Sequence, residues 1–176
     1  MAREPPPFVS GSWIHAAFTP PAQREAWMHA ELALSDALVD EMIAADLIVI
    51  GVPMYNFNVP ASLKAYIDQV VRVGRTFGFD RTRPGKPYWP LLSEQQKRLV
   101  ILSSRGDHGY GYGEENFSLN HTEPSIQAAF AYMGVQESYR VAVDYDEFGG
   151  TLLGDSLARA EAQVDELVQA LAADRA

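Results

Sequence analysis

The residues of this chain that could bind a ligand lie in two short segments, each of which follows an apolar run. The segment 53–58 is rich in aromatic and amide side chains and comes directly after Leu47–Val52, whereas 103–108 comes directly after 99–102. Unbroken runs of β-branched residues are typical of buried parallel strands. Open α/β sheets bind ligands at the carboxyl ends of their strands, so we expect the two segments to converge on one site. The candidate residues are Pro53, Met54, Tyr55, Asn56, Phe57, Ser104, Arg105, Gly106 and His108.

The elements that must position these segments are predicted to alternate between helices and strands. Apolar residues recur at helical spacing in four stretches, and three short apolar runs have the length of strands. This order is typical of a parallel sheet with helices on its faces, although only three strands are visible. We expect the strand at Leu47 to be buried on both faces. The predicted helices span 21–45, 60–73, 122–133 and 156–172, and the predicted strands span 47–52, 99–102 and 139–143.

Two further stretches are predicted to lack regular structure. We expect one domain that covers residues 1–176. Within it, residues 1–22 are rich in proline and are expected to form an extended segment that packs against the rest. Residues 75–97 are expected to form a loop with an unusually high content of large apolar side chains. Composition leaves two interpretations of that loop open, a cluster packed on its own domain or part of a subunit interface and pocket wall.

Composition excludes several classes of function. The net charge of −9 disfavours nucleic acid or an anionic membrane as a partner. The chain has no cysteine, which excludes disulfides and thiolate chemistry and is compatible with a cytoplasmic location. No stretch approaches the ~20 apolar residues of a membrane span. His15, His29 and His121 stand singly without metal-ligand spacing, and the acids at 114–115 and 144–147 are scattered, so we expect no metal site and no acid–base pair.

One segment carries a family resemblance. Pro53-Met-Tyr-Asn-Phe-Asn58, followed by Pro60-Ala-Ser-Leu-Lys-Ala-Tyr-Ile-Asp68, resembles the flavin-contacting segment of the FMN-dependent NADH:azoreductases, which also act as quinone reductases. The resemblance implies a flavodoxin-like fold, FMN as cofactor and NADH or NADPH as electron donor. It further implies two-electron reduction of an azo compound or quinone by ping-pong hydride transfer, in which the flavin supplies the chemistry and no catalytic triad or dyad is expected.

The resemblance also assigns roles to individual residues. It places 53–57 along the flavin ring, with main-chain N–H groups of Asn56 and Phe57 directed to its N5/O4 side. Ser104-Arg105-Gly106 resembles the family's Ser-Arg-Gly-Gly run beside the pyrimidine edge. His108 is a candidate donor there, although the comparable His or Tyr of the family generally stands one residue further on and Asp107 replaces a glycine. Family members are homodimers whose pockets borrow aromatics from the neighbouring subunit, and Phe79 and Tyr132 stand where those substrate-binding residues would fall.

The sequence departs from the family at its beginning. Nothing corresponds to the family's opening strand, phosphate-binding loop and first helix, and Ser10-Gly11-Ser12 is the only nearby candidate for a phosphate cradle. Two interpretations follow: an N-terminally shortened version of an ordinary enzyme, or a non-catalytic subunit that has lost phosphate binding and acts through a partner chain. In either case we expect the edge of the strand at Leu47 to be covered by the N-terminal segment or by a partner.

Overall fold

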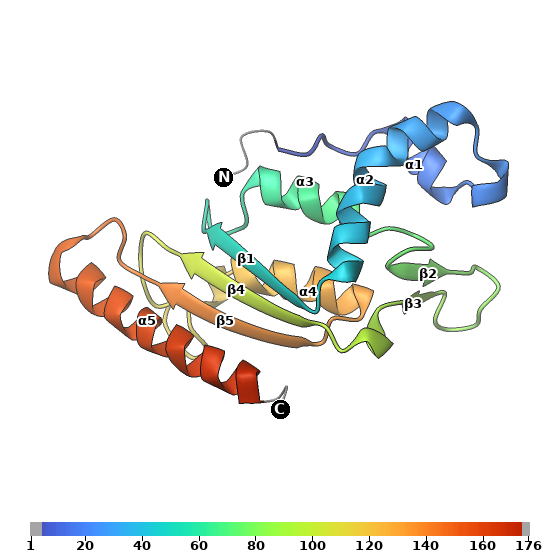
Figure 1. The fold of residues 1–176 in the computed structure, drawn as a ribbon. Helices are drawn as coiled ribbons and strands as arrows, with labels where there is room; N and C mark the ends of the chain where they lie inside the picture. Colours follow the sequence, from blue (N-terminus) through green and yellow to red (C-terminus); the bar gives the residue numbers. More distant parts are fainter. Residues whose placement is uncertain (1–4, 174–176) are drawn as a thin grey trace. The chain divides into compact units, whose positions relative to one another are not determined.

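The structure is a computed structural model that describes residues 5–173 (Figure 1). These residues form two compact units, and each unit is assembled from three separate stretches of the chain. The first unit contains the described residues up to 48 together with 60–99 and 126–138, and the second contains 49–59, 100–125 and the described residues from 139 onward. The single domain expected from the sequence stays a prediction. None of the helices in the described part of the chain is long and apolar enough to cross a membrane.

The sheet that carries both ligand-binding segments has three strands in the order β1-β4-β5. Strands β1 (Leu47–Pro53), β4 (Arg98–Ser104) and β5 (Glu137–Val143) run in the same direction (Figure 1). The expected three-stranded parallel sheet is therefore confirmed. Because the strands are parallel, the segments that follow them leave the sheet at the same edge.

Burial of β1 differs from the expectation. Ile50 and Val52 are buried, but Leu47 is 37% exposed and Val49 is 55% exposed. The prediction that this strand is buried on both faces was wrong. Side chains alternate between the two faces of a strand, so Leu47 and Val49 lie on the face opposite Ile50 and Val52, and that face stays open in the described part of the chain.

The N-terminal segment contains a helix, so the prediction of an extended segment over 1–22 was wrong for its central part. Helix α1 (Gly11–Phe18) begins after Ser10, whose hydroxyl accepts a hydrogen bond from the Trp13 amide at 3.0 Å. Its prolines lie outside the helix, at 5–7 and 20–21, where they do not interrupt it. Trp13, Ala16 and Ala17 form a hydrophobic cluster with two residues of α2, Met28 and Leu32. The remaining helical elements of this part are a 3₁₀ turn (Pro21–Gln23), α2 (Ala26–Ala44) and α3 (Ala61–Val70).

The apolar stretch after α3 forms a two-stranded hairpin, where the sequence predicted a loop. Strands β2 (Phe77–Phe79) and β3 (Tyr88–Pro90) are antiparallel, and Gly78 faces Trp89. A Cβ atom on Gly78 would lie 2.0 Å from Cε2 of the indole, so only glycine lets the ring cover this strand. The ring of Phe79 stacks on that of Tyr88, with centroids 4.7 Å apart. The hairpin thus owes its order to ring packing rather than to a periodic pattern.

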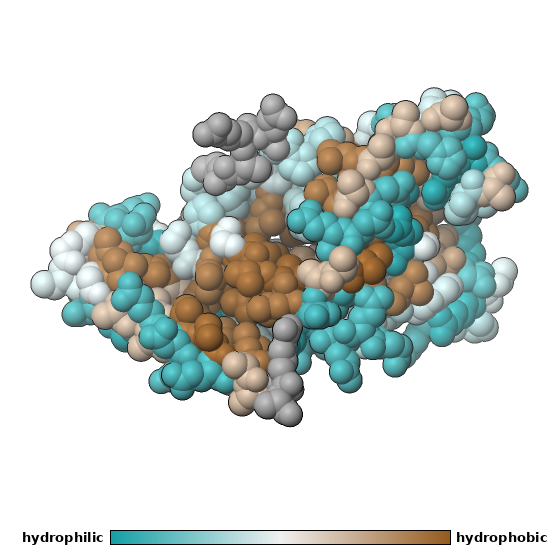
Figure 2. Space-filling view, in the orientation of Figure 1, coloured by the Kyte–Doolittle hydropathy of each residue, from teal (hydrophilic) through white to brown (hydrophobic). Residues whose placement is uncertain are grey.

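The closing helix covers part of the second unit. Helix α4 (Thr122–Met133) has the predicted bounds, whereas α5 (Gly150–Ala173) begins six residues before the predicted Ser156. Helix α5 runs beside β5 (Figure 1), and the Ser156 hydroxyl accepts a hydrogen bond from the Asp144 amide at 2.9 Å. An apolar groove of about 300 Å³ lies between α5 and the strands, and Figure 2 shows the apolar side chains gathered over this face of the sheet. Its apolar lining residues are Leu102, Val141, Val143, Leu157, Ala160 and Val164.

Candidate functional site

The segment after β1 is a tight two-residue turn. The Tyr55 amide donates to the Asn58 carbonyl at 2.8 Å, and the Asn58 amide donates to the Tyr55 carbonyl at 3.0 Å. The two residues between them, Asn56 and Phe57, both have positive φ, at 49° and 67°. These features define a type I′ turn, in which glycine and asparagine are favoured and phenylalanine is strained. The strain at Phe57 marks this turn as a place where backbone geometry serves something other than stability.

The turn leaves two backbone donors free. Neither the Asn56 amide nor the Phe57 amide donates to any group within residues 5–173. Both residues are exposed, and the Phe57 side chain is 46% exposed. Amides that lie at the carboxyl end of a strand without a protein partner are suited to the acceptor atoms of a ligand.

The segment after β4 is tied to this turn and to the end of β5. The Met54 amide donates to the Ser104 carbonyl at 2.8 Å, and the Arg105 amide donates to the Val143 carbonyl at 2.9 Å. The structure therefore brings the two sequence-predicted segments together, as expected. The next two amides, those of Gly106 and Asp107, donate to no described residue, so this segment too presents free donors.

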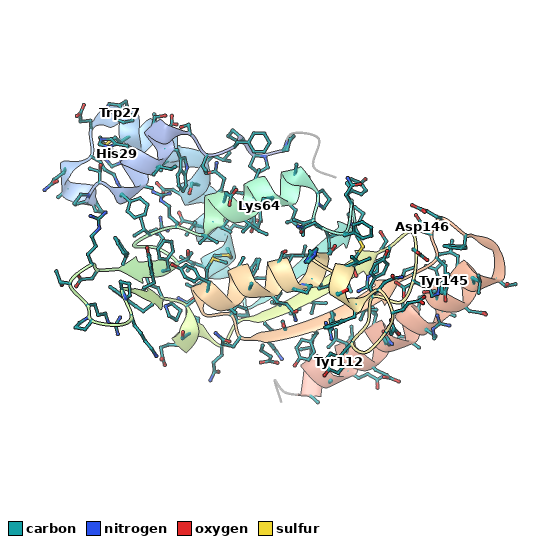
Figure 3. All side chains as sticks on the ribbon, turned by 180° about the vertical axis from the view of Figure 1, so that it is seen from behind. Trp27, His29, Lys64, Tyr112, Tyr145 and Asp146 are labelled. Atoms are coloured by element: carbon teal, nitrogen blue, oxygen red, sulfur yellow. The ribbon has the colours of Figure 1, made fainter. Side chains whose placement is uncertain are left out.

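A third segment, 144–149, joins the site from the carboxyl end of β5. Its backbone closes over the second segment, because the Asp146 amide donates to the Arg105 carbonyl and the Glu147 amide to the Gly106 carbonyl, both at 3.1 Å. Tyr145 and Asp146 lie in this loop between β5 and α5 (Figure 3). The acids at 144–147 were expected only to be scattered, and this segment was not predicted from the sequence as part of the site. The rule that had located the other two loops, carboxyl ends of parallel strands, would also have located this one.

His108 lies between the second and third segments. Its imidazole stacks on the ring of Tyr145, with centroids 4.6 Å apart and planes 19° from parallel, and Tyr145 itself has a positive φ of 71°. Asp107 accepts hydrogen bonds from the His108 amide and from its Nδ1, both at 2.8 Å. These two bonds hold the pKa of the Asp107 carboxyl below its usual value. Asp107 therefore fixes the orientation of the imidazole and leaves Nε2, which is 3.6 Å from Glu115, on the other side of the ring.

Arg105 does not offer its charge to solvent. Its guanidinium is buried and pairs with Glu123 at 2.6 Å and with Asp144 at 3.3 Å. Burial would raise the pKa of Glu123, but hydrogen bonds from Ser103 and Arg105 outweigh it and the pKa is lowered. For Asp144, burial dominates and raises the pKa.

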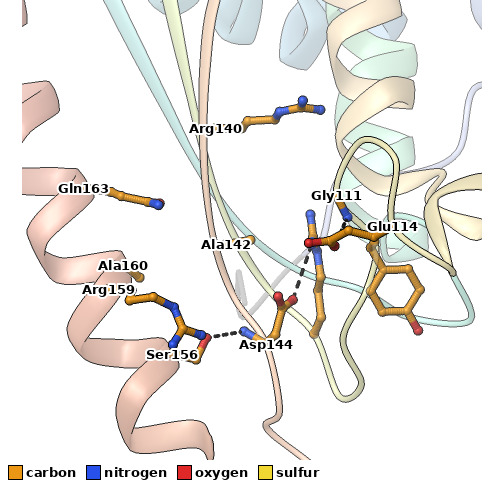
Figure 4. A pocket seen from close by; sticks show the side chains of 11 residues that line it. Gly111, Glu114, Arg140, Ala142, Asp144, Ser156, Arg159, Ala160 and Gln163 are labelled. Atoms are coloured by element: carbon orange, nitrogen blue, oxygen red, sulfur yellow. Dashed lines mark hydrogen bonds and ion pairs between the residues drawn. The ribbon is translucent and has the colours of Figure 1, made fainter.

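A polar pocket of about 360 Å³ opens beside these groups. Arg140, Asp144 and Ser156 line it, together with Arg159 from α5 (Figure 4). The Gly111 amide donates to the Glu114 carboxylate at 2.6 Å on its far wall. Tyr110, Gly111 and Glu114 of the loop 109–121 thus form one wall of this pocket, which Arg105 also lines.

The two residues expected to contact the acceptor lie in the other unit. Phe79 and Tyr132 belong to an aromatic cluster with Phe77 and Tyr88, in which the rings of Phe77 and Tyr132 are 5.1 Å apart. Tyr88 is 49% exposed and Tyr132 is 40% exposed, so the cluster presents ring surface to the outside. Their assignment as substrate-binding residues stays a prediction.

The candidate phosphate cradle is used within the protein. The hydroxyls of Ser10 and Ser12 both donate to the Glu31 carboxylate at 2.8 Å, and these bonds lower the pKa of Glu31. A carboxylate that already accepts both hydroxyls would repel a phosphate. We therefore discard the segment 10–12 as a phosphate site. In the described part of the chain, no group of three or more His, Asp or Glu side chains could hold a metal ion.

An isoalloxazine ring fits the donors that the two segments present. Such a ring carries acceptor atoms along two edges, and the free amides of Asn56 and Phe57 lie on one segment while those of Gly106 and Asp107 lie on the next. The Met54–Ser104 bond fixes the two segments to each other. When bound, FMN would accept a hydride and pass its two electrons to an acceptor, whereas the protein positions the ring and meets its charge.

Comparisons with known proteins show the family to which the chain belongs. The family described as "Flavodoxin-like fold" matches residues 1–171. The FMN-dependent NAD(P)H:quinone oxidoreductase 1 of Pseudomonas aeruginosa is 46% identical over 162 residues, covering 92% of this chain and 76% of that protein. The FMN-dependent NADH:quinone oxidoreductase 2 of Colwellia psychrerythraea is 42% identical over 171 residues, covering 97% and 77%.

Solved structures agree on the fold. A Bacillus anthracis FMN-dependent NADH-azoreductase, solved in complex with FMN, has a TM-score of 0.78 and 20% identity, covering 94% of this chain and 76% of that one. Azoreductase AzrA has a TM-score of 0.79 and 19% identity, covering 93% and 76%. The expected flavodoxin-like α/β fold is confirmed.

Proposed function

The chain belongs to the flavodoxin-like family of FMN-dependent NAD(P)H:quinone oxidoreductases and azoreductases, and on that premise we propose that it binds FMN and reduces quinones or azo compounds with NADH or NADPH. The observation that carries the proposal is the type I′ turn at Asn56 and Phe57. Its strained backbone and free amides lie next to a second segment of free amides, and apolar packing at the end of a sheet would require neither feature.

The residues of the site have distinct roles in this proposal. Backbone amides of 56–57 and 106–107 hold the two edges of the ring, and the exposed side chains of Tyr55 and Phe57 flank it. Ser104 acts through its carbonyl, which fixes Met54, and Arg105 acts through its backbone, since its guanidinium is paired inside the protein. His108, oriented by Asp107, stands beside the pyrimidine edge as a donor for charge that develops there on reduction.

The same proposal includes a homodimer. The exposed cluster of Phe79, Tyr88 and Tyr132 offers flat ring surface of the kind that stacks on an aromatic acceptor. In a dimer, this cluster would cover the site of the neighbouring subunit, and contact with a partner would also bury apolar side chains such as Val49 of β1. A cytoplasmic location stays a prediction.

Reconstitution tests the proposal. We expect purified protein mixed with FMN to retain a visible flavin absorption band after desalting, to lose this band anaerobically with NADH or NADPH, and to regain it with a quinone. The second candidate, a non-catalytic subunit, predicts protein that stays colourless and inactive with added FMN. The dimer is tested separately by light scattering of the same sample.

A further inference from the structure

The first turn of α4 contacts both ligand-binding segments. The His121 amide, directly before the helix, donates to the Phe57 carbonyl at 2.9 Å. Two residues later, Glu123 accepts hydrogen bonds from Ser103 at 2.5 Å and from the Arg105 guanidinium at 2.6 Å, both through its Oε1. One helical turn therefore links the segment after β1 to the segment after β4.

Arg105 extends this link to the third segment. Its other guanidinium nitrogen, Nη1, is 3.3 Å from Asp144, whose amide is held by Ser156 of α5. The guanidinium also lies over the ring of Tyr110, 5.6 Å from its centroid. The second and third loops thus meet at one buried charge, and the first loop is joined to them through the backbone of His121.

Stability alone does not account for this arrangement. Glu123 is 0% exposed, and its second oxygen, Oε2, has no hydrogen-bond partner among the described residues; the same is true of Arg105 Nε. A buried ion pair with unpartnered polar atoms is on average no more stabilising than apolar residues of similar volume. What apolar residues would not do is fix the distance between two loops, because dispersion contacts have no preferred direction.

We propose that Glu123 is a positioning residue: through Arg105 it holds the free amides of 106–107 at a fixed spacing from those of 56–57, and its charge balances Arg105 beside the ring. This inference rests on the proposed function. It adds Glu123, which lies outside the two segments that are expected to contact the flavin ring. Glu123 is ionised in the folded protein, since its pKa is lowered, so both parts of the role operate at neutral pH.

Glu123→Gln tests both parts, because it keeps the shape and removes the charge. If the spacing between the amides of 56–57 and those of 106–107 loosens, the Kd for FMN should rise roughly tenfold, which is the scale of one lost charged hydrogen bond. Without the negative charge of Glu123, the positive charge of Arg105 is no longer balanced. The midpoint potential of the bound flavin should then rise, since a positive charge near the ring favours the reduced anion. Glu166→Gln, which removes one exposed charge from α5, is the matched control and should change neither quantity.

Arg105→Met separates positioning from general loosening. It also breaks the link, so the Kd for FMN should rise, but it leaves Glu123 uncompensated, so the midpoint potential should fall. The two variants should therefore shift the midpoint potential in opposite directions while both raise the Kd for FMN. This combination is expected only if the two charges act on the flavin ring. Equal shifts in both variants, or a Kd for Glu123→Gln within twofold of the parent and an unchanged potential, would overturn the proposal.

Hydrogen exchange of the protein without FMN keeps the test independent of the proposed function. We expect faster exchange in both 54–58 and 104–108 for Glu123→Gln than for the parent, and unchanged exchange for Glu166→Gln. Failure of the parent to bind FMN would refute the proposed function, whereas unchanged exchange in these loops would refute the positioning role. Ser103→Ala removes one of the two donors to Glu123 and should show the same changes at smaller size, which serves if Glu123→Gln does not fold.

Discussion

Replacing Phe57 by glycine tests whether the turn after β1 is as strained as its backbone indicates. Phe57 has a φ of 67°, and the left-handed region costs a residue with a Cβ about 1–2 kcal/mol, a cost that glycine does not carry. Glycine also gives the Asn-Gly pair that type I′ turns favour.

The expected magnitudes follow from three contributions. Phe57→Gly relieves the strain, but it loses about 0.5–1 kcal/mol to the greater entropy of the unfolded chain. The side chain is 46% exposed, so its removal costs at most about 1 kcal/mol of burial. These contributions nearly cancel for glycine. Phe57→Ala keeps the strain and still loses the burial, so we expect it to be about 1 kcal/mol less stable than Phe57→Gly.

Urea unfolding of the two variants without FMN measures this difference. The same pair of substitutions at Tyr112 is the control, because Tyr112 is 85% exposed and is not among the residues with positive φ. Glycine there should be no more stable than alanine. If Phe57→Ala is as stable as Phe57→Gly, the turn is not strained and the argument from strain to function fails.

Four further substitutions test other contacts. Because Glu123 has a lowered pKa, the unfolding free energy that separates the parent from Glu123→Gln should be constant above its ordinary value of 4.5 and shrink as the pH falls through the folded value, which pH-dependent urea curves measure. Asp144 has a raised pKa, so its ionised form costs stability, and Asp144→Asn should gain stability relative to the parent as the pH rises above 3.8, seen in the same curves. Gly78→Ala should lose about 1–3 kcal/mol in thermal unfolding, because the new methyl would overlap the Trp89 indole. The Lys97 ammonium is buried and donates to the carbonyls of Ile43 and Ala45 at 2.6 Å each, so Lys97→Met should lose about 1–3 kcal/mol by leaving these carbonyls at the end of α2 unpartnered.

The sequence predicted the sheet and its ligand-binding edge because hydrophobic runs and loop chemistry are local signals. The runs at 47–52, 99–102 and 139–143 all became strands, and both predicted loops follow their strands as expected. The convergence of 53–58 and 103–108 was also predictable, since it needs only parallel strands.

Three features were not predictable because they depend on contacts between distant residues. Burial of β1 depends on what packs against it, and a valine such as Val49 is equally compatible with a covered and an open face of the strand. The hairpin at 77–90 depends on Trp89 covering Gly78, which no periodicity reports. The position of the Arg105 side chain depends on its ion pair with Glu123, eighteen residues away. In the sequence, Glu123 is indistinguishable from the acidic residues that commonly occupy the first turn of a helix.

Hydrogen exchange of the full chain with and without FMN tests the central claim most directly. The amides of 56–57 and 106–107 donate to no described residue, so they should exchange readily in the free protein. If they hold the flavin ring, FMN will slow exchange in both 54–58 and 104–108. Bound FMN that leaves both segments unchanged would contradict the site.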